Sequence, residues 1–231
     1  LLNNDTRAAP QWLSELKRTL DENPSAGFCS SKMLFADQPD VINSVGIGFT
    51  RAGTAFDVGY GEKDGDRFTA PRPIFGACAG AAMYRRKVFD DVGLFDEDLF
   101  MWYEDADLSF RAQLAGYGCR FVPTAIVYHI GGGTASPNHK SHIFYCSRNQ
   151  ILILAKNLPD ALRVHYFSRL ILICLKHLFK TLLRGETTVL RGYLAALKDL
   201  KYFIRKGKLT SYKTVASVQE LSRLLKMDSY N

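Results

Sequence analysis

Three carboxylates stand within four positions of one another in the stretch WYEDADLSFRAQLAGYG, residues 102–118. They are Glu104, Asp105 and Asp107, and they follow a bulky Trp-Tyr pair. The apolar spacing after them predicts a helix that ends at two glycines. Acidic side chains in a first turn complement the positive end of a helix dipole, and a carboxylate at the same place can also serve as a general base. The stretch by itself leaves both interpretations open.

Asp107 has a partner of its own within the predicted helix. Arg111 follows it by four residues, and side chains at this spacing lie on the same face of a helix. We therefore predict an Asp107–Arg111 ion pair with a structural role, which leaves Glu104 and Asp105 as the candidates for chemistry.

The elements that must position these carboxylates alternate between helix and strand, which indicates an α/β architecture. Two leucines at the start of the chain indicate the end of a core strand. Further along, the pattern predicts a helix that begins near Pro10, a strand over 26–35, a hairpin-like or irregular stretch over 36–70, a short helix that ends near Gly93, and a strand over 119–133.

After about residue 143 the chain becomes helical and basic. Residues 1–150 carry a net charge of −3, and residues 151–231 carry +10. The most apolar part has a charge-free run over only 170–175, whereas a membrane-spanning helix needs roughly 20 apolar residues. Such helices fit an anionic membrane surface or a bundle that packs on the rest of the protein and exposes its lysines. We expect no nucleic-acid partner, because no recognised motif accompanies the charge.

The cysteines are five in number and never form a close pair. This scatter argues against a disulfide framework or a thiolate zinc site and is typical of a reducing cytosol. We therefore expect a cytoplasmic protein, at the inner face of the plasma membrane if the basic helices dock there. The five are Cys29, Cys78, Cys119, Cys146 and Cys174.

Four segments follow one another along the first 150 residues: LNNDT, GACAGAAMYRR, FDEDLFMWYEDADLSFRAQLAGY and FVPTAIVYHIGGGTAS. In order and spacing they closely resemble glycosyltransferase family 2, in its bacterial rhamnosyltransferase-like branch. The resemblance implies a GT-A-type α/β domain over 1–150 and a basic helical extension over 151–231. The family's first strands and nucleoside-binding loop do not appear, and the chain opens on Leu1. We therefore expect that this part of the domain is missing upstream.

The resemblance also implies a divalent metal, Mg²⁺ or Mn²⁺, held by Asp5 and His129. Asp5 matches the last acidic position of the family's metal motif, which here reads NND instead of a run of aspartates. A metal at this place offsets the charge that develops on a departing nucleoside diphosphate. His129 matches a histidine that is a further ligand in some relatives. From the residues alone, a turn or helix cap at Asp5 and a structural histidine at position 129 are the alternatives.

The same resemblance makes Asp105 the catalytic base. Inverting transfer needs a carboxylate opposite the departing diphosphate, where it takes the proton of the acceptor hydroxyl. Glu104 would position Asp105 or contact the acceptor.

Six further residues are expected to bind the donor or the acceptor. Three small residues would form a floor under the sugars, with tight strand packing as the alternative. An aspartate and a tryptophan would line the acceptor pocket. An arginine would reach the diphosphate or merely extend from a helix into solvent. The six are Gly76, Ala77, Gly80, Asp96, Trp102 and Arg148.

These expectations describe an inverting glycosyltransferase in bacterial cell-surface polysaccharide synthesis. It would move a sugar from a nucleotide-sugar donor to a hydroxyl on a glycan or polyprenyl-linked acceptor. A metal-dependent phosphoesterase would gather more ligands than Asp5 and His129 supply. The alternative is a non-catalytic domain that binds a sugar nucleotide or associates with a membrane.

Overall fold

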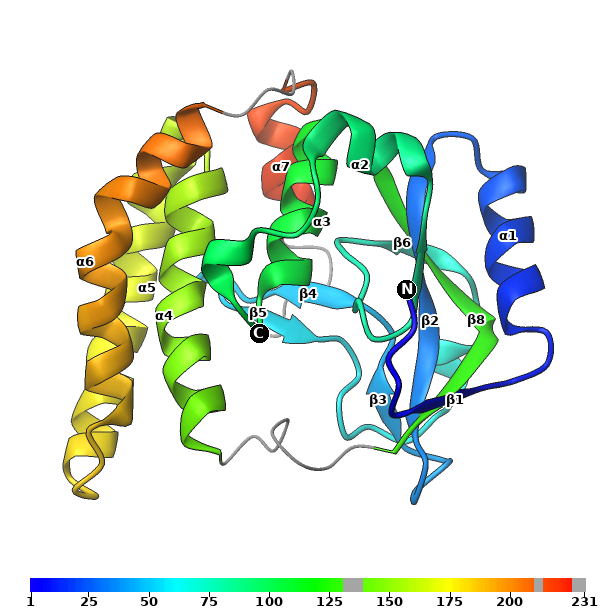
Figure 1. The fold of residues 1–231 in the computed structure, drawn as a ribbon, viewed down its shortest axis with the longest axis horizontal. Coiled ribbons are helices and arrows are strands. Elements are labelled where there is room, and N and C mark those ends of the chain that lie inside the picture. The colour runs from blue at the N-terminus through cyan, green and yellow to red at the C-terminus, as the bar shows by residue number, and fades with distance from the viewer. Residues whose placement is uncertain (131–138, 210–213, 226–231) are drawn as a thin grey trace.

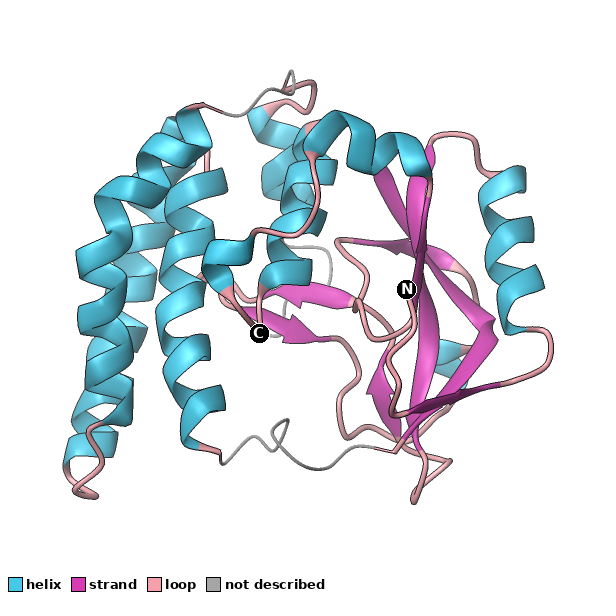
Figure 2. Ribbon diagram, in the orientation of Figure 1, coloured by secondary structure: helices cyan, strands magenta, loops and turns pink. Residues whose placement is uncertain are grey.

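A curled β-sheet and a group of long helices form the two sides of the molecule (Figures 1 and 2). The computed structural model describes residues 1–130, 139–209 and 214–225. Helix α1 (Trp12–Glu22) covers the outer side of the sheet, and α4 (Lys140–Asn157), α5 (Asp160–Leu182) and α6 (Thr188–Lys208) stand at the opposite end. Helix α3 (Glu104–Leu114) packs between them, against both the sheet and α4.

The centre of the sheet is a parallel pair of long strands, β2 (Ala26–Phe35) and β8 (Gly118–His129). The strand order is β1-β8-β2-β3, and β6 and β7 add to β8 and β2 respectively. Strands β4 and β5 form a separate antiparallel pair. The remaining elements are β1 (Thr6–Ala8), β3 (Ile42–Ser44), β4 (Ile47–Phe49), β5 (Ala55–Asp57), η1 (Asp66–Phe68), β6 (Arg72–Ile74), β7 (Ala82–Tyr84), α2 (Arg86–Val92), η2 (Glu97–Leu99) and α7 (Val218–Leu224).

The predicted α/β class and the helical C-terminal extension are confirmed. Strand β2 covers the predicted range 26–35 and is buried along almost its whole length, as expected for a central parallel strand. Helix α1 turns Leu16 and Leu20 toward the sheet, and helix α2 ends at Gly93 as predicted.

The core strand predicted at the first two residues is wrong. Leu1 and Leu2 are exposed, and Leu2 makes only an isolated bridge to Ala81. The strand begins later, at Thr6, because the turn at Asn4 and Asp5 must first bring the chain alongside β8.

One hydrophobic cluster joins the helices on both sides of the predicted boundary at residue 150. It contains Phe49 and Phe110 together with Leu154, Tyr166 and Phe203. Helix α4 itself runs through residue 150 without a break and packs along α6. Within the described residues, none of the helices combines the length and the apolar character that crossing a membrane requires.

Candidate active site

The loop before α3 holds three non-glycine residues in the left-handed backbone region. Phe100, Trp102 and Tyr103 have φ values of 65°, 60° and 71°. Side chains disfavour this conformation, so the surrounding structure must enforce it, and such strain is common at functional sites. The loop ends where the acidic cluster begins, so its conformation decides where the first turn of α3 points.

Asn149 on α4 holds this loop in place. Its side-chain amide is fully buried and donates to the carbonyls of Leu99, Met101 and Trp102 at 2.9, 3.0 and 2.8 Å. Arg148 completes the arrangement by donating to the Asn149 side-chain oxygen at 2.8 Å.

Asp105 sits in the first turn of α3, where its carboxylate accepts backbone hydrogen bonds from two elements. Oδ2 accepts from the N–H of Ala79 at 3.1 Å and Oδ1 from the N–H of Ala106 at 2.8 Å. Desolvation by the surrounding protein raises the pKa of Asp105 above its ordinary value, and these hydrogen bonds oppose part of the shift. A carboxylate with a raised pKa is a stronger proton acceptor, which suits a general base.

Glu104 lies beside Asp105 and shares its environment. Desolvation first, and the charge of Asp105 second, raise the pKa of Glu104 to about 7. Its Oε2 is buried, and no hydrogen-bond partner for it exists among the described residues. The two carboxylates that were selected from the sequence, Glu104 and Asp105, therefore share one desolvated environment, and Asp107 is not part of it.

Asp57, at the end of β5, is a third carboxylate near this site, and sequence analysis did not select it. Desolvation raises its pKa to about 6, hydrogen bonding from Ser44 and Cys78 opposes the shift, and the charge of Asp105 adds to it. The residue nonetheless keeps solvent access. Its position near Asp105 depends on the β4–β5 hairpin, which lies within the stretch 36–70 that the sequence predicted to be hairpin-like or irregular.

Asp5 and His129 meet at the far edge of the sheet. Strand β1 pairs antiparallel with β8 so that Thr6 lies opposite His129, which places His129 Nε2 3.1 Å from Asp5 Oδ2. His129 Nδ1 lies 3.1 Å from Oδ1 of Asn43. When Nδ1 donates to Asn43, Nε2 turns a lone pair toward Asp5, and two acceptors then face each other across a place that suits a cation.

The carboxylate of Asp5 and the imidazole of His129 are both suitable ligands for a divalent metal, but they supply only two of the ligands that such an ion needs. The other Asp5 oxygen, Oδ1, is buried and has no partner within the described residues. In that part of the chain, no group of three or more His, Cys, Asp or Glu side chains is arranged so that it could hold a metal ion. Oxygen atoms of a bound diphosphate are the kind of further ligand that such a metal takes.

A short segment of small residues connects the two halves of the site. The N–H of Ala79 reaches Asp105, and the next carbonyl, that of Gly80, accepts from the N–H of Asn3 at 2.9 Å. A Cβ at Gly80 would lie 3.0 Å from Met33 Cε and 3.6 Å from Asn3 Nδ2. The segment therefore contacts both Asp105, the candidate base, and Asn3, which lies two residues before the candidate metal ligand Asp5.

Gly76 and Ala77, in contrast, support the packing alternative. A Cβ at Gly76 would stand 2.5 Å from Ser109 Oγ, and Ala77 is fully buried in the core. Their small size allows the close approach of α3 to the strand.

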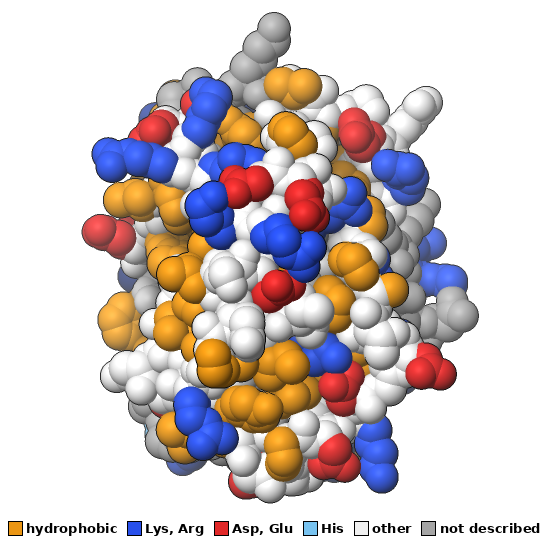
Figure 3. All heavy atoms as spheres, turned by 90° about the vertical axis from the view of Figure 1, so that its right-hand side faces the viewer, with side chains coloured by type: hydrophobic (Ala, Val, Ile, Leu, Met, Phe, Trp, Pro, Cys, Tyr) orange, Lys and Arg blue, Asp and Glu red, His pale blue; other side chains and the backbone are white. Residues whose placement is uncertain are grey.

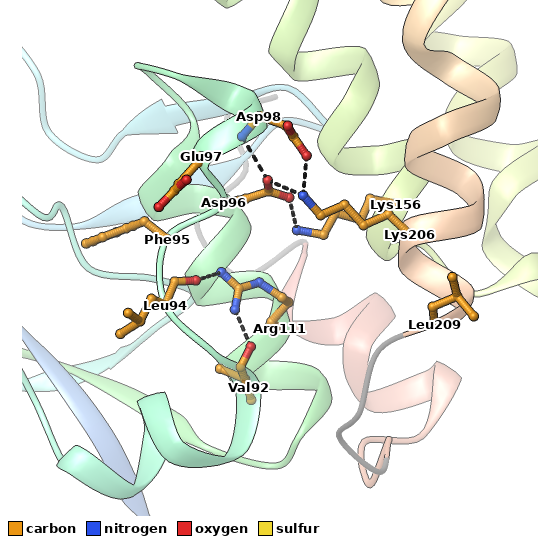
Figure 4. Close-up of a pocket in the computed structure, with 10 residues that line it drawn as sticks. All are labelled: Val92, Leu94, Phe95, Asp96, Glu97, Asp98, Arg111, Lys156, Lys206 and Leu209. Atoms are coloured by element: carbon orange, nitrogen blue, oxygen red, sulfur yellow. Dashed lines mark hydrogen bonds and ion pairs between the residues drawn. The ribbon is translucent and has the colours of Figure 1, made fainter.

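Asp96 and Asp107 belong to a buried ionic network on the other side of α3. Figure 4 shows the part of it formed by Asp96, Lys156 and Lys206. The predicted Asp107–Arg111 pair is confirmed, at 2.9 Å. Lys156 of α4 joins both carboxylates, at 2.6 Å from Asp96 and 2.8 Å from Asp107, and Lys206 of α6 reaches Asp96 at 2.6 Å. A cavity of about 470 Å³ borders this network. Asp96 therefore holds helices together here and lies apart from the Asp105 cluster.

Arg148 and Trp102 also make contacts within the protein. The Arg148 guanidinium pairs with Asp199 of α6 at 2.8 Å and donates to the carbonyl of Asp98 at 3.1 Å. The Trp102 ring packs edge-on against His142 with centroids 4.9 Å apart and remains half-buried. Trp102 thus packs at the loop that leads to Glu104 and Asp105, whereas Arg148 stabilises that loop from helix α4.

The sequence and the structure were compared with known protein families, curated proteins and solved structures. The model of the glycosyl transferase family group 2 matches residues 1–180. Over 84 residues the chain is 33% identical to the N-acetylglucosaminyl-diphospho-decaprenol L-rhamnosyltransferase of Mycobacterium tuberculosis, a match that covers 36% of this chain and 27% of that protein. Over 134 residues it is 31% identical to the uncharacterized protein y4gI of Sinorhizobium fredii, covering 56% of this chain and 15% of that one.

Among solved structures, a crystal structure of GalNAc-T7 with UDP, GalNAc and Mn²⁺ aligns with a TM-score of 0.42 and 16% identity. The alignment covers 71% of this chain and 36% of that chain. The matched segments thus span well under half the length of each of these relatives. Because the family model covers more than half of the residues, the chain belongs to the glycosyl transferase family group 2.

Proposed function

We propose that the complete protein transfers a sugar from a nucleotide-sugar to an acceptor hydroxyl, with inversion at the anomeric carbon. The observation that carries this proposal is the placement of Asp105. A desolvated carboxylate stands at the start of α3 and accepts from the N–H of Ala79, and the neighbouring Gly80 carbonyl accepts from Asn3, two residues before Asp5 and its partner His129.

In this reaction Asp105 accepts the proton of the acceptor hydroxyl. The freed oxygen attacks the anomeric carbon, the bond from that carbon to the diphosphate breaks, and the nucleoside diphosphate leaves from the opposite face. The N–H groups of Ala79 and Ala106 fix the orientation of the carboxylate. Glu104, whose Oε2 has no hydrogen-bond partner among the described residues, would accept a hydrogen bond from the acceptor.

Asp5 and His129 would hold a Mg²⁺ or Mn²⁺ ion, and Asn43 would orient the histidine. The ion supplies positive charge that stabilises the departing diphosphate. The chain's own contribution is a carboxylate oxygen that has no partner among the described residues and a histidine that contacts Asn43 through its other nitrogen.

The relative from M. tuberculosis suggests the substrate class. Its name specifies a rhamnosyl group and a polyprenyl-diphosphate-linked N-acetylglucosamine. We propose a lipid-linked or glycan acceptor of this kind, in the assembly of a bacterial cell-surface polysaccharide. Trp102 and Gly80 remain candidates for sugar contacts, and Asp57 joins them because of its place beside Asp105.

The test measures nucleoside diphosphate release by the complete protein, including any sequence that precedes Leu1. A panel of nucleotide-sugars is offered with Mn²⁺ or Mg²⁺, and a membrane extract supplies acceptors. Asp105→Asn should lower release by about a hundredfold or more, within the range that positioned acid–base groups contribute. Asp21→Asn, at an exposed position on α1, is the control for the substitution.

Three results would change the proposal. Release that survives Asp105→Asn would place the base elsewhere. Release that needs no divalent ion would remove the metal role of Asp5 and His129. Donor binding without any release would favour the alternative of a non-catalytic domain that binds a sugar nucleotide.

A further inference from the structure

Helix α5 carries several apolar side chains that face solvent. Positions 164, 171, 175 and 182 recur at intervals of seven, four and seven residues, so they share one face of the helix. The exposed fractions reach 82% at Val164, 69% at Leu172 and 67% at Phe179. The apolar face of α5 consists of Val164, Ile171, Leu172, Leu175, Phe179 and Leu182.

The opposite side of the same helix is already used for packing. Tyr166 and Leu170 are 1% exposed and belong to the large hydrophobic cluster. The N-terminal half of α5 is therefore anchored to the protein, and the apolar face is additional to what the core requires.

Basic residues flank the apolar face. Arg169, Lys176, Lys180 and Arg184 are exposed, and no acidic residue occurs between positions 161 and 185. In the part of the chain that the structure describes, no carboxylate pairs with Lys176, Lys180 or Arg184.

The face that carries α1 differs in this respect. Blue and red side chains are intermixed there (Figure 3). On α1 itself, Lys17 pairs with Asp21 and Arg18 with Glu15. The acid-free basic flank of α5 is thus a local property and does not follow from the overall charge alone.

We propose that α5 lies in the plane of an anionic membrane, with its apolar face among the acyl chains and its lysines and arginines at the headgroups. A helix with one apolar and one basic side binds in this way, because apolar burial and attraction to anionic lipid act together. Contact with a bilayer would also remove a large apolar surface from water, which a protein seldom leaves uncovered.

The positive charge beside the apolar face of α5 favours a membrane over a second copy of the chain as the partner of this face. A symmetric dimer through this face would bring the unpaired lysines of two copies together, and like charges repel. An anionic lipid surface instead offers the opposite charge. The proposal rests on residues remote from Asp105 and holds independently of the transfer reaction.

The test is sedimentation of the 231-residue chain with vesicles of phosphatidylcholine, with and without phosphatidylglycerol. We expect binding to the anionic vesicles that weakens as salt is raised. The variant L172E/F179E should reduce the partition coefficient by about tenfold or more, because it places two charges where apolar side chains would insert.

The control variant is L13E/L94E. Leu13 and Leu94 are also exposed, at 57% and 72%, but lie on α1 and next to α2. Binding of this variant should match that of the original chain. A third variant, K176E/K180E, should weaken binding to anionic vesicles and leave the weak binding to neutral vesicles unchanged.

Several outcomes would overturn the proposal. These are no vesicle binding, equal loss in the control variant, or equal binding to neutral and anionic vesicles. A fourth outcome comes from sedimentation equilibrium without lipid. If the chain forms a dimer that the L172E/F179E substitutions dissociate, and does not bind vesicles, the apolar face of α5 is a contact with a second copy. Circular dichroism melting of each variant shows that the comparison is made between folded proteins.

Discussion

The side-chain amide of Asn149 donates a 2.8 Å hydrogen bond to the backbone carbonyl of Trp102, one of three carbonyls that it binds in the loop before α3. The two residues are 47 positions apart. Through this contact α4 fixes a loop whose residues Trp102 and Tyr103 have positive φ. The position of Asp105 therefore depends on a residue that takes no part in the proposed chemistry.

Replacing Asn149 should destabilise the protein and disorder the acidic pair. Asn149→Ala leaves buried carbonyls without donors, so we expect a loss of about 2–4 kcal/mol in the free energy of unfolding. Urea denaturation measures it, and Gln11→Ala, an exposed amide on the surface, is the control. A loss as small as that of the control would show that the loop holds its conformation without Asn149.

Removing Lys156 should cost more than removing any surface lysine. Lys156 pairs with Asp96 and Asp107, and all three side chains are almost completely buried. Lys156→Met leaves two buried carboxylates short of their shared cation, so we expect a loss of about 3–5 kcal/mol. Lys17→Met, which breaks the exposed pair with Asp21, should cost at most about 1 kcal/mol. Equal losses would mean that the network around Asp96 adds little to stability.

Stability should depend on pH through Glu104. Its pKa rises to about 7 on folding, so the folded state binds a proton that the unfolded chain releases at lower pH. The free energy of unfolding should therefore fall as pH rises from the ordinary glutamate range toward pH 7. Glu104→Gln carries no titrating group and should gain stability relative to the original chain at pH 8 but not at pH 4.

Urea denaturation at the two pH values tests this. Glu97→Gln, in the exposed turn before the loop, controls for the change of carboxylate to amide. A stability difference for Glu104→Gln that is the same at both pH values would show that Glu104 is not desolvated as the structure indicates.

Metal binding should depend on Asp5, His129 and the histidine's partner Asn43. With UDP as the probe diphosphate, Asp5→Asn should abolish measurable Mn²⁺ binding by the complete protein. Asn43→Ala should weaken it by about 10–100-fold, as expected for a residue that orients a ligand. Calorimetry or electron paramagnetic resonance gives the affinities, and Asp37→Asn, on an exposed loop, is the control. Unchanged Mn²⁺ affinity in Asp5→Asn would disprove the metal role.

Gly76 should tolerate no side chain. Because a Cβ would meet Ser109 Oγ at 2.5 Å, Gly76→Ala must push α3 away from the strand, and we expect a loss of about 1–3 kcal/mol. Gly65→Ala is the matched control, since the nearest atom to its Cβ is 4.0 Å away and its φ is −149°. Thermal melting compares the two. If Gly76→Ala leaves the melting temperature unchanged, close packing does not explain the glycine, and the sugar-binding role predicted from the sequence would be favoured.

Several elements and one contact could be predicted from the sequence because they depend on neighbours along the chain. The range of β2, the start of α3 and the Asp107–Arg111 pair all follow from local periodicity. The family resemblance, confirmed by the match over residues 1–180, rests on the order of motifs, which is also read along the chain.

The remaining features depend on contacts between distant residues, which periodicity does not encode. His129 faces Asp5 only because of the register between β1 and β8, and Asn43 and Asp57 reach the site only through β3 and the β4–β5 hairpin. Asp96 was predicted to line the acceptor pocket, and it lies against Lys156 and Lys206, because helices α4 and α6 fold back toward α3. The sequence thus determines which side chains can carry charge or bind a ligand. The tertiary structure decides which partner each of them contacts, because a charge that is buried in the packed interior needs an opposite charge beside it.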